Sequence, residues 1–464
     1  QAGLRSRLKD KLDLQMRRFC ERLLLQEDYW GGSILQDHGL RSITRFGTAA
    51  CNMLGVLDEA GFWFGLANRH LHRTLDALPR DGAIPHTSYG KIHLYMDDMV
   101  AWRDAYLHVS GHDVFQRPVF PKIVEFLWQH LDTDTETVFL AHPRGDQRPL
   151  AAGWGFFNAI ASAQQNPLAF HLAKRILSRH LEQERVPLRP LATWLDAVKH
   201  APDSPRPSTR VPSQQGLHVY RDSGIIQYRA SHAKAQVSVI CPAHPAISSR
   251  LHTNNGPDRV GMAPLAGHFT VAIAGRPLLV TAEGGYRMTS SLASVLLVDG
   301  EGGHADRGFV MGAFNTPWRG EHIQTATYDP NTQIAHVQLE LHQAYRREQR
   351  IRRYHREFLL TPSGFTVRDS LLADIPHQYG WRLHTYQRCE VSRSGPNECR
   401  VADGDAALEI SNRGQPCQLE VCDEAPDIVW AYGHDQADAG FHEITYDTHE
   451  PSKDLAIEWS FRWS

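Results

Sequence analysis

The spacing of apolar residues changes near residue 200 of this chain. Before that point, apolar side chains recur at three- and four-residue steps, as in Leu4, Leu8, Leu12 and Met16, which is the period of an amphipathic helix. The pattern predicts about eight helices, at residues 4–25, 36–59, 62–77, 91–109, 116–131, 150–163, 167–184 and 190–199. No strand-like alternation interrupts them, so a helical domain is expected over residues 1–200.

Beyond residue 215, apolar and polar residues alternate, and turn signals separate the alternating segments. This pattern is typical of a large antiparallel β-sandwich over residues 216–464. The expected strands are Val219–Tyr228, Gln236–Ile240, His268–Ile273, Ser294–Val298, Ile323–Tyr328, Ala335–Leu341, Phe365–Val367, Gly380–Tyr386 and Leu455–Trp463. The intervening segment, 201–215, is rich in proline and serine and reads as a linker.

Composition and charge exclude several classes of protein. The net charge of -3 gives no basic footprint for nucleic acid. No apolar run approaches the roughly 18 residues that a membrane span requires. The seven cysteines form no CxxC pair, so neither a zinc finger nor a disulfide framework is indicated. Cys417 and Cys422 are close enough in sequence to bridge, but the sequence does not decide this.

A polar cluster ahead of a hairpin is the most site-like stretch. It contains Arg250, His252, Asn254 and Asn255, in a loop punctuated by glycine and proline. Two apolar runs follow, separated by Ala274-Gly275-Arg276, which predicts a tight hairpin. Imidazole, amide and guanidinium groups on a loop beside a rigid hairpin are typical of a functional site, although an ordinary surface loop has the same composition.

Two further stretches place polar residues at the starts of helices. Asp37 is suited to capping the helix that follows it, which puts His38 in the first turn. The Asp81-Gly82 turn delivers Tyr89 to a loop ahead of the helix at 91–109. Tyr95 falls within that helix, where a core aromatic is the commoner role.

The stretch from Arg250 onward resembles the core motif of heparinase II/III-type polysaccharide lyases. The resemblance rests on the imidazole loop, the hairpin with Gly-x-Pro-Leu-Leu-Val, a Gly-Gly-Tyr and a Leu-Leu-Val-Asp-Gly, and it extends through Arg353–Tyr386. It implies an N-terminal α/α toroid, incomplete here because only about eight helices are expected, joined to a C-terminal antiparallel β-sandwich. It also implies β-elimination on uronic-acid polysaccharides.

The resemblance assigns roles to the helix-start residues. His38 matches a histidine that acts as base or neutraliser, and Asp37 stands where the family has an asparagine that binds the uronate carboxylate. Tyr89 lies at the family's distance from His38 and is the expected catalytic tyrosine, with Tyr95 as the alternative. His86 falls where the family often has glutamate and is expected to contact substrate.

The family loop usually reads His-x-His, with the first residue catalytic and the second a metal ligand. This chain has one histidine there, so two registers are open: either Asn254 replaces the metal ligand after His252, or Arg250 replaces the catalytic histidine before it. We prefer the first, because a guanidinium is always charged and cannot act as a base, although it can bind a carboxylate. Asn255 is a further expected substrate contact.

Some family members hold a structural zinc, completed by an aspartate after the hairpin and a late histidine. The aspartate position falls near Thr281 or Glu283, and the late histidine resembles His384. A structural divalent metal on Glu283 and His384 is therefore an expectation, with no metal required for the chemistry. A lone histidine on a strand is more often a core residue.

An arginine-rich run from Arg346 to Arg356 is a further candidate. On a regular strand, Arg350, Arg352, Tyr354 and Arg356 share one face. Such a face is commonly solvated, but guanidinium groups also suit the carboxylates and sulfates of an acidic glycan.

The resulting hypothesis is a lyase that binds an acidic polysaccharide in a cleft between toroid and sandwich and uses Tyr89, His38 and His252 for proton transfer. Two alternatives stay open. A glycoside hydrolase needs two carboxylates, for which Asp37 and Asp81 are available, and a glycan-binding protein without activity fits the departures at Asp37 and His252. The sequence does not identify the polymer or the cellular compartment.

Overall fold

The computed structural model has the two-part organisation that the change of period predicts, helical first and β-sheet afterwards. The structure describes residues 2–25, 37–83, 89–133, 137–138, 148–149, 153–182, 211–240, 266–281, 293–302, 322–414, 417–422 and 441–463. None of the helices in these ranges is long and apolar enough to cross a membrane.

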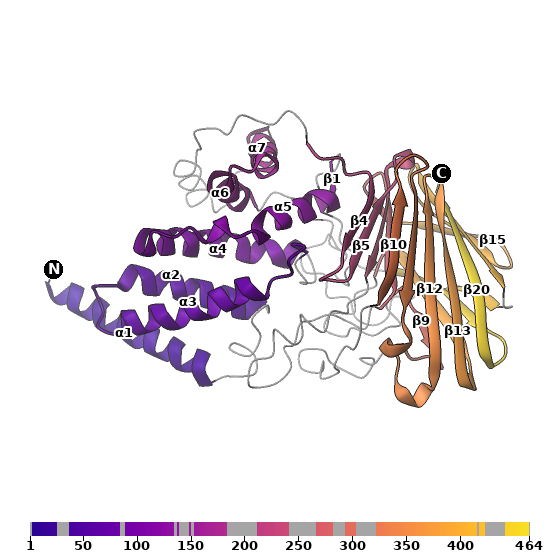
Figure 1. The fold of residues 1–464 in the computed structure, drawn as a ribbon, viewed down its shortest axis with the longest axis horizontal. Coiled ribbons are helices and arrows are strands. Elements are labelled where there is room, and N and C mark those ends of the chain that lie inside the picture. The colour runs from indigo at the N-terminus through magenta and orange to yellow at the C-terminus, as the bar shows by residue number, and fades with distance from the viewer. Residues whose placement is uncertain are drawn as a thin grey trace. The chain divides into compact units, whose positions relative to one another are not determined.

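The chain forms two compact units (Figure 1). The first comprises Gln1–Leu127 and Leu150–Pro212, and the second comprises Trp128–Pro149 and most of the chain from Ser213 onward. Residues 211–215, at the end of the predicted linker, form neither helix nor strand, and 201–210 lie outside the described residues.

Seven of the predicted helices are present, and the eighth, at 190–199, lies outside the described residues. They are α1 (Ala2–Leu25), α2 (Asp37–Met53), α3 (Ala60–Ala77), α4 (Tyr89–Ser110), α5 (Val119–His130), α6 (Trp154–Gln164) and α7 (Pro167–Glu182). The predicted helix 36–59 is too long, because α2 ends at Met53 and Gly55 has a φ of 75°. A positive φ is incompatible with a continuing right-handed helix.

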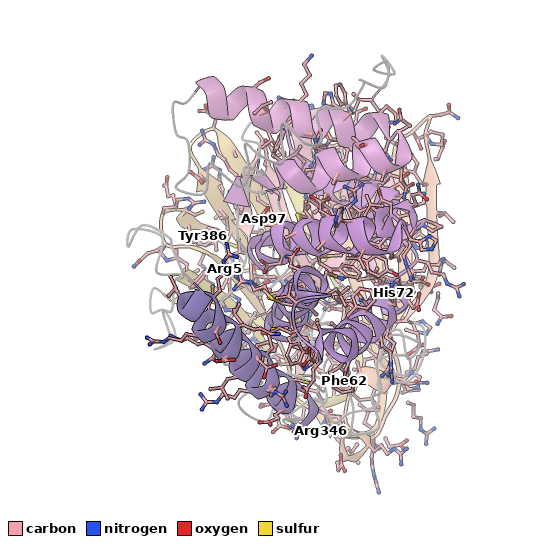
Figure 2. All side chains as sticks on the ribbon, turned by 90° about the vertical axis from the view of Figure 1, so that its left-hand side faces the viewer. Arg5, Phe62, His72, Asp97, Arg346 and Tyr386 are labelled. Atoms are coloured by element: carbon pink, nitrogen blue, oxygen red, sulfur yellow. The ribbon has the colours of Figure 1, made fainter. Side chains whose placement is uncertain are left out.

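Helix α3 packs one of its faces against α4. On α3, His72 packs edge-on against Trp102 and Tyr106 of α4, whereas Phe62 is 60% exposed (Figure 2). The side chains of α3 thus divide between a face that contacts α4 and a face toward solvent, and Phe62 is an apolar residue on the solvent face.

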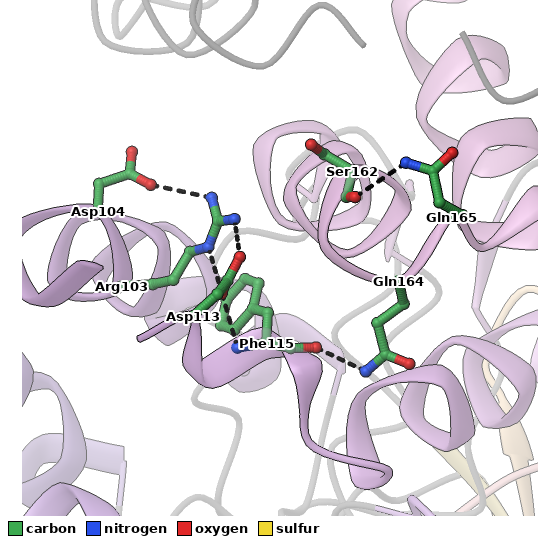
Figure 3. Close-up of polar contacts among 7 residues, drawn as sticks. All are labelled: Arg103, Asp104, Asp113, Phe115, Ser162, Gln164 and Gln165. Carbon is green, nitrogen blue, oxygen red and sulfur yellow. Dashed lines mark hydrogen bonds and ion pairs between the residues drawn. The ribbon is translucent and has the colours of Figure 1, made fainter. Parts of the chain in front are cut away.

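A buried ion pair ties α4 to the short helix η1 (Val114–Gln116). Arg103 is 3% exposed, and its Nε donates to Asp113 Oδ1 at 2.8 Å (Figure 3). Asp113 also accepts from the backbone N–H of Phe115, and Gln164 of α6 donates to the Phe115 carbonyl at 2.6 Å. These contacts fix three elements of the helical unit to one another.

A small sheet interrupts the region that the sequence predicts to be wholly helical. It consists of β1 (Leu131–Asp132), β2 (Thr137–Val138) and β3 (Arg148–Pro149). The prediction was wrong here because strands of two residues are too short to show a period of two.

The second unit is an antiparallel β-sandwich. One layer is an eight-stranded sheet in the order β10-β11-β12-β13-β20-β17-β16-β15. A five-stranded sheet, β4-β5-β6-β7-β8, and a four-stranded sheet, β18-β19-β14-β9, pack on it. Phe269 of β7 contacts Phe358, Phe365 and Phe461 of the large sheet, and Trp381 of β14 contacts Trp459 of β20.

Each predicted strand overlaps an observed one, but residues 390–422 and 441–448 contain five further strands that the alternation does not predict. The five-stranded sheet contains β4 (Gly216–Tyr220), β5 (Ile225–Arg229), β6 (Ala235–Ile240), β7 (His268–Ile273) and β8 (Arg276–Leu279). The four-stranded sheet contains β9 (Leu296–Val298), β14 (Tyr379–Tyr386), β18 (Cys417–Cys422) and β19 (Phe441–Thr448). The large sheet contains β10 (Ile323–Asp329), β11 (Ile334–Glu340), β12 (Ile351–Thr361), β13 (Gly364–His377), β15 (Glu390–Gly395), β16 (Glu398–Asp403), β17 (Ala406–Gly414) and β20 (Ser452–Trp463).

Two turn predictions have opposite outcomes. The β7–β8 hairpin is confirmed: Ile273 pairs with Arg276, and both Ala274 and Gly275 have positive φ, as a type I′ turn requires. The segment predicted as one strand, Val219–Tyr228, is instead the β4–β5 hairpin, because the residues between Tyr220 and Ile225 form its turn.

Cys417 and Cys422 lie at the two ends of strand β18. An extended strand rises about 3.4 Å per residue, so their Cα atoms are roughly 17 Å apart. A disulfide needs Cα atoms within about 7 Å. The two cysteines therefore cannot bridge each other.

The arginine-rich run does not form the predicted face. The register between β12 and β13 shifts between Ile351 and Arg353, and Arg350 precedes the strand with a φ of 50°. Tyr354 and Arg356 point into the core, at 0% and 1% exposure. A bulge reverses the alternation, so Arg350 and Arg352 do not share an acidic-glycan path with Arg356.

Arg356 forms a buried ion pair with Asp369. Its Nε and Nη2 donate to the two carboxylate oxygens, each at 2.7 Å, and its Nη1 donates to the carbonyls of Gly267 at 2.8 Å and Ser294 at 3.0 Å. Asp369 also accepts from Tyr354 Oη and Trp381 Nε1. Burial alone would lower the pKa of Arg356, but the Asp369 charge keeps that pKa above its usual value.

We expect Asp369→Asn to lower the free energy of unfolding by about 3–5 kcal/mol, because it leaves the guanidinium charge buried without its counter-charge. Chemical denaturation followed by tryptophan fluorescence measures this. The matched control is Arg368→Ala, which breaks the exposed Arg368–Glu458 pair one residue away and should cost no more than about 1 kcal/mol. Equal losses in the two variants would contradict the assignment.

Candidate active site

The two helix-start candidates lie at the beginnings of their helices. Helix α2 begins at Asp37, which places His38 in its first turn as predicted. Helix α4 begins at Tyr89, so this residue is the first of the helix and not part of a loop ahead of residue 91. Predicted helix boundaries are commonly off by one or two residues.

Helices α2 and α4 run parallel. Arg41 and Arg45 of α2 both donate to Asp98 of α4, at 3.2 Å and 3.0 Å, and Gly47 lies against Trp102, further along both helices. Residues with higher numbers on α2 thus meet residues with higher numbers on α4. The first turns of the two helices, which contain His38 and Tyr89, consequently lie at the same end of the pair.

The turn ahead of Tyr89 is as the Asp-Gly sequence predicts. Gly82 N donates to Pro79 O at 3.0 Å, and Ala83 N donates to Asp81 Oδ1 at 3.2 Å. Gly82 has a φ of 77°, and a Cβ there would lie 2.2 Å from the backbone carbon of Lys122 in α5. This turn therefore requires glycine, and it fixes the chain that leads to α4 against α5.

Most of the predicted site side chains lie outside the described residues. The side chains of Asp37, His38, Tyr89 and Tyr95 lie outside the described residues, although their helical backbone is described. His86, Arg250, His252, Asn254, Asn255 and Glu283 lie wholly outside the described residues. Their roles stay predictions.

A buried polar cluster lies where the segments containing His252 and Glu283 join the sheet. His268, the first residue of β7, is 0% exposed. Its Nδ1 accepts from Ser294 N at 2.8 Å, so its Nε2 carries the proton and donates to Thr281 Oγ1 at 2.6 Å. No sequence pattern predicts this role, because His268 reads only as the start of a strand.

His384 lies beside this cluster on β14. Its Nε2 contacts Glu443 Oε2 at 3.1 Å, while its buried Nδ1 has no hydrogen-bond partner among the described residues. The backbone N–H of Val280 donates to the His384 carbonyl at 2.9 Å, which joins the end of β8 to β14.

The described residues do not make up a metal site. Both nitrogens of His268 are engaged, and nowhere in the described ranges do three histidine, cysteine, aspartate or glutamate side chains gather as a metal requires. His384 is available at one nitrogen, and Thr281 supplies a hydroxyl that His268 already uses. A ligand set would need Glu283 or another residue outside those ranges, and no chemical step is assigned to a metal.

The pKa of His268 is lowered to about 3. Burial is the main cause, and the neighbouring His384 and Arg356 add to it. The neutral imidazole keeps the tautomer that the Ser294 and Thr281 contacts require.

The lowered pKa of His268 predicts that stability falls in acid. The folded-state pKa of about 3 lies below the ordinary value near 6.5, so the unfolded chain binds more protons as the pH drops from about 6.5 to 3. The free energy of unfolding should fall by up to about 1.4 kcal/mol per pH unit in this window from His268 alone. Urea unfolding of the parent and of His268→Gln at several pH values measures the difference.

Burial alone would raise the pKa of Glu443, but its contact with His384 lowers that pKa below its ordinary value. The stabilisation that Glu443 contributes is therefore lost only at a pH below its ordinary pKa. An acid-induced loss between pH 6.5 and 5 that is the same in His268→Gln would contradict the assignment to His268.

For the expected metal, the test is elemental analysis of the purified protein, together with His384→Ala. If a structural metal is bound through His384, we expect a stoichiometric divalent ion that the variant loses. A stoichiometric ion that survives in the variant would contradict the role of His384.

No protein-family model matches the chain, and no curated protein matches it. Solved structures, in contrast, do match the chain. Heparinase III aligns with a TM-score of 0.61 at 11% identity, covering 94% of this chain and 62% of that one. A heparan sulfate lyase from Pedobacter heparinus aligns with a TM-score of 0.56 at 11% identity, covering 92% and 60%. The chondroitin AC lyase of Streptomyces coelicolor A3, in complex with chondroitin sulphate, aligns with a TM-score of 0.54 at 13% identity, covering 95% and 62%.

This chain therefore spans about three fifths of the length of these enzymes. The likeness covers nearly all of the chain and both of its units, but identities this low establish the fold and not the activity. The expected fold is confirmed: the chain has the fold of these polysaccharide lyases, an incomplete N-terminal α/α toroid followed by an antiparallel β-sandwich.

Proposed function

We propose that this protein is a polysaccharide lyase that cleaves a uronic-acid-containing polysaccharide by β-elimination. The observation that carries the proposal is the fold shared with three lyases over more than nine tenths of the chain. The parallel pairing of α2 and α4 supports it, because it brings the helix starts that contain His38 and Tyr89 to one end of the helical unit.

β-Elimination removes the proton on C5 of the uronate and expels the glycosidic oxygen from C4. The C5 proton is too weakly acidic for a side-chain base unless the adjacent carboxylate is neutralised, which lets charge develop as an enolate that hydrogen-bond donors stabilise. A base must then reach C5, and an acid must reach the leaving oxygen.

In the proposed mechanism, Tyr89 transfers the protons, and His38 and His252 assist as base or neutraliser. A phenol suits both roles where nearby cations lower its pKa. Arg250 is the proposed carboxylate-binding group, because a guanidinium binds carboxylates in a bidentate fashion.

The remaining predicted residues, Asp37, His86, Tyr95, Asn254 and Asn255, are proposed as substrate contacts. Among substrates, the acidic glycosaminoglycans are the first to test, because the structural neighbours include a heparan sulfate lyase and a chondroitin AC lyase in complex with chondroitin sulphate.

A glycoside hydrolase has less support. Its two carboxylates would be Asp37 and Asp81, but Asp81 accepts the backbone N–H of Ala83 inside its own turn. A carboxylate that closes a turn is poorly placed to act on substrate. Unsaturated product ends, detected by ultraviolet absorbance, mark a lyase, whereas reducing ends without unsaturation would mark a hydrolase.

We expect Tyr89→Phe to lower the rate of elimination by about 10²–10⁴-fold, because it removes the hydroxyl that transfers the proton. Folding and glycan binding should persist, since only one atom is lost. The measurement is the initial rate of ultraviolet absorbance on a polymer that the parent protein cleaves, with the melting temperature recorded alongside.

The matched control for this experiment is Tyr95→Phe, the same change six residues further along α4. Because Tyr95 is proposed only as a substrate contact, this change should slow elimination far less than Tyr89→Phe does. Near-parent elimination by Tyr89→Phe would show that Tyr89 is not the proton-transfer residue, and a large loss in Tyr95→Phe alone would transfer the role to Tyr95.

A further inference from the structure

Four exposed arginines gather where the turn after β11 enters β12, and we call them the arginine patch. Arg347 begins the short helix η6 (Arg347–Gln349), Arg350 follows it, and Arg352 and Arg353 lie at the start of β12. An extended chain spans at most about 3.6 Å per residue, so the first and last Cα atoms of the patch are within about 22 Å of each other. The four guanidinium groups therefore belong to one small area of the surface.

A β-bulge places two of these arginines on the outer face of the large sheet. The register between β12 and β13 shifts between Ile351 and Arg353, so Arg352 is the extra residue. Tyr354 is buried in the core, which directs Arg353 to the opposite, outer face. Arg352 is exposed and forms an ion pair with Asp374 of β13. The bulge thus turns outward an arginine that a regular strand would direct into the core.

The turn that carries Arg347 and Arg350 is held by buried contacts. Gln349 is buried, its side chain donates to the Val298 carbonyl at 3.2 Å, and its own carbonyl accepts from His377 Nε2 at 2.7 Å. Arg350 has a φ of 50°, which is uncommon for a residue with a side chain. The backbone of the patch is therefore fixed in advance, which reduces the entropy lost when a ligand binds.

Three arginines of the patch lack a counter-charge. Among the described residues, no carboxylate or other acceptor contacts the side chains of Arg347, Arg350 and Arg353, whereas Arg352 is paired. One carboxylate, Glu348, is exposed in the same turn. The patch therefore carries an excess of positive charge, although the whole chain has a net charge of -3.

Exposed arginines elsewhere on the large sheet are matched by carboxylates. Arg368 of β13 pairs with Glu458 of β20. On β17, Arg413 also lies directly opposite Glu458, and Arg462 of β20 lies opposite Glu409. Opposite charges at facing positions stabilise a sheet and leave little net charge on it. The arginine patch departs from this pattern, so pairing between strands does not account for it.

We propose that the arginine patch is a second binding site for an acidic polysaccharide, formed by none of the residues proposed for catalysis. Guanidinium groups bind carboxylates and sulfates through two parallel hydrogen bonds. Exposed ion pairs are individually weak, so the site works by several contacts made at once along one polyanionic chain. The choice of polysaccharide rests on the proposed lyase function, whereas the anion-binding character rests only on the described residues.

The test variant combines Arg347→Gln, Arg350→Gln and Arg353→Gln, which removes three exposed charges and no contact between described residues. A second variant, Glu348→Gln, removes the negative charge in the same turn. The matched control removes three exposed charges from the same sheet, through Arg368→Gln, Arg413→Gln and Arg462→Gln.

Binding of the full chain to immobilised heparan sulfate and chondroitin sulfate is measured by surface plasmon resonance at two ionic strengths. Duplex DNA is the comparison polyanion, and the melting temperature of each variant reports folding. A site for glycan should prefer at least one of the two polysaccharides over DNA.

For the patch variant, we expect the Kd for the preferred polysaccharide to rise by about 10–50-fold at low salt, because three exposed pairs of up to about fivefold each are lost. The difference should shrink at higher ionic strength, since exposed charges are screened. The control variant should bind nearly as the parent does. Glu348→Gln should bind about twofold more tightly, because it removes a repulsive charge.

Equal weakening in the two triple variants would show that net charge alone governs binding, and would overturn the site. Binding to DNA as tight as to either polysaccharide would overturn its specificity for glycan. A parent protein that binds neither polysaccharide would overturn the proposal altogether.

The site and the proposed catalysis can fail separately. If the parent cleaves a polysaccharide, the patch variant should raise KM on long chains and leave kcat unchanged, because its residues do not touch the reacting atoms. If the parent cleaves no polymer while the patch variant still binds more weakly than the control, the proposed function fails and the binding site stands.

Discussion

The buried pairing of Arg356 with Asp369 is the constraint on which the β-sandwich depends. Taking a guanidinium and a carboxylate out of water costs several kcal/mol for each group. Only a close pair whose hydrogen-bonding atoms are all satisfied offsets this cost. Here the pairing is complete at Asp369, whose two oxygens accept from Arg356, Tyr354 and Trp381. Strands β12 and β13 must therefore pair in this register, because any other leaves a buried charge without its partner, and β14 of the opposite layer brings Trp381 to the same carboxylate.

The same constraint extends from Asp369 to the residues that precede β7 and β9. Arg356 uses its remaining donors on the carbonyls of Gly267 and Ser294, and His268 completes the cluster with Thr281. A hydrophobic core would hold these positions only loosely, since apolar contacts are not directional. Hydrogen bonds from a fixed guanidinium and a buried imidazole define both distance and direction, which is what a pre-organised site requires.

Most of the fold could be predicted from the sequence because long elements show their period. The apolar pattern predicts helix α4 and strands β7 and β14 close to their observed bounds, but it predicts only Phe365–Val367 of β13 and none of β15 to β19. The failures have local causes. The strands of the small sheet have two residues each, and the shift in register at Ile351 and Arg353 reversed the faces of the arginine-rich run. Contacts such as Arg356 with Gly267 join residues far apart in the chain, and no local pattern in a single sequence reports them.

The helix-start residues show which part of a site a sequence can reveal. In a series of helical hairpins, alternate helices run in the same direction. Helices α2 and α4 are therefore parallel, and α3, which lies between them in the sequence, runs the opposite way. Polar residues at the start of alternate helices therefore gather at one end of such a domain, however far apart they are in sequence. His38 and Tyr89 follow this rule because each lies in the first turn of its helix, which the sequence alone predicts. His268 does not, because its role arises from partners on other strands, and only the folded chain brings Thr281 and Ser294 to its two nitrogens.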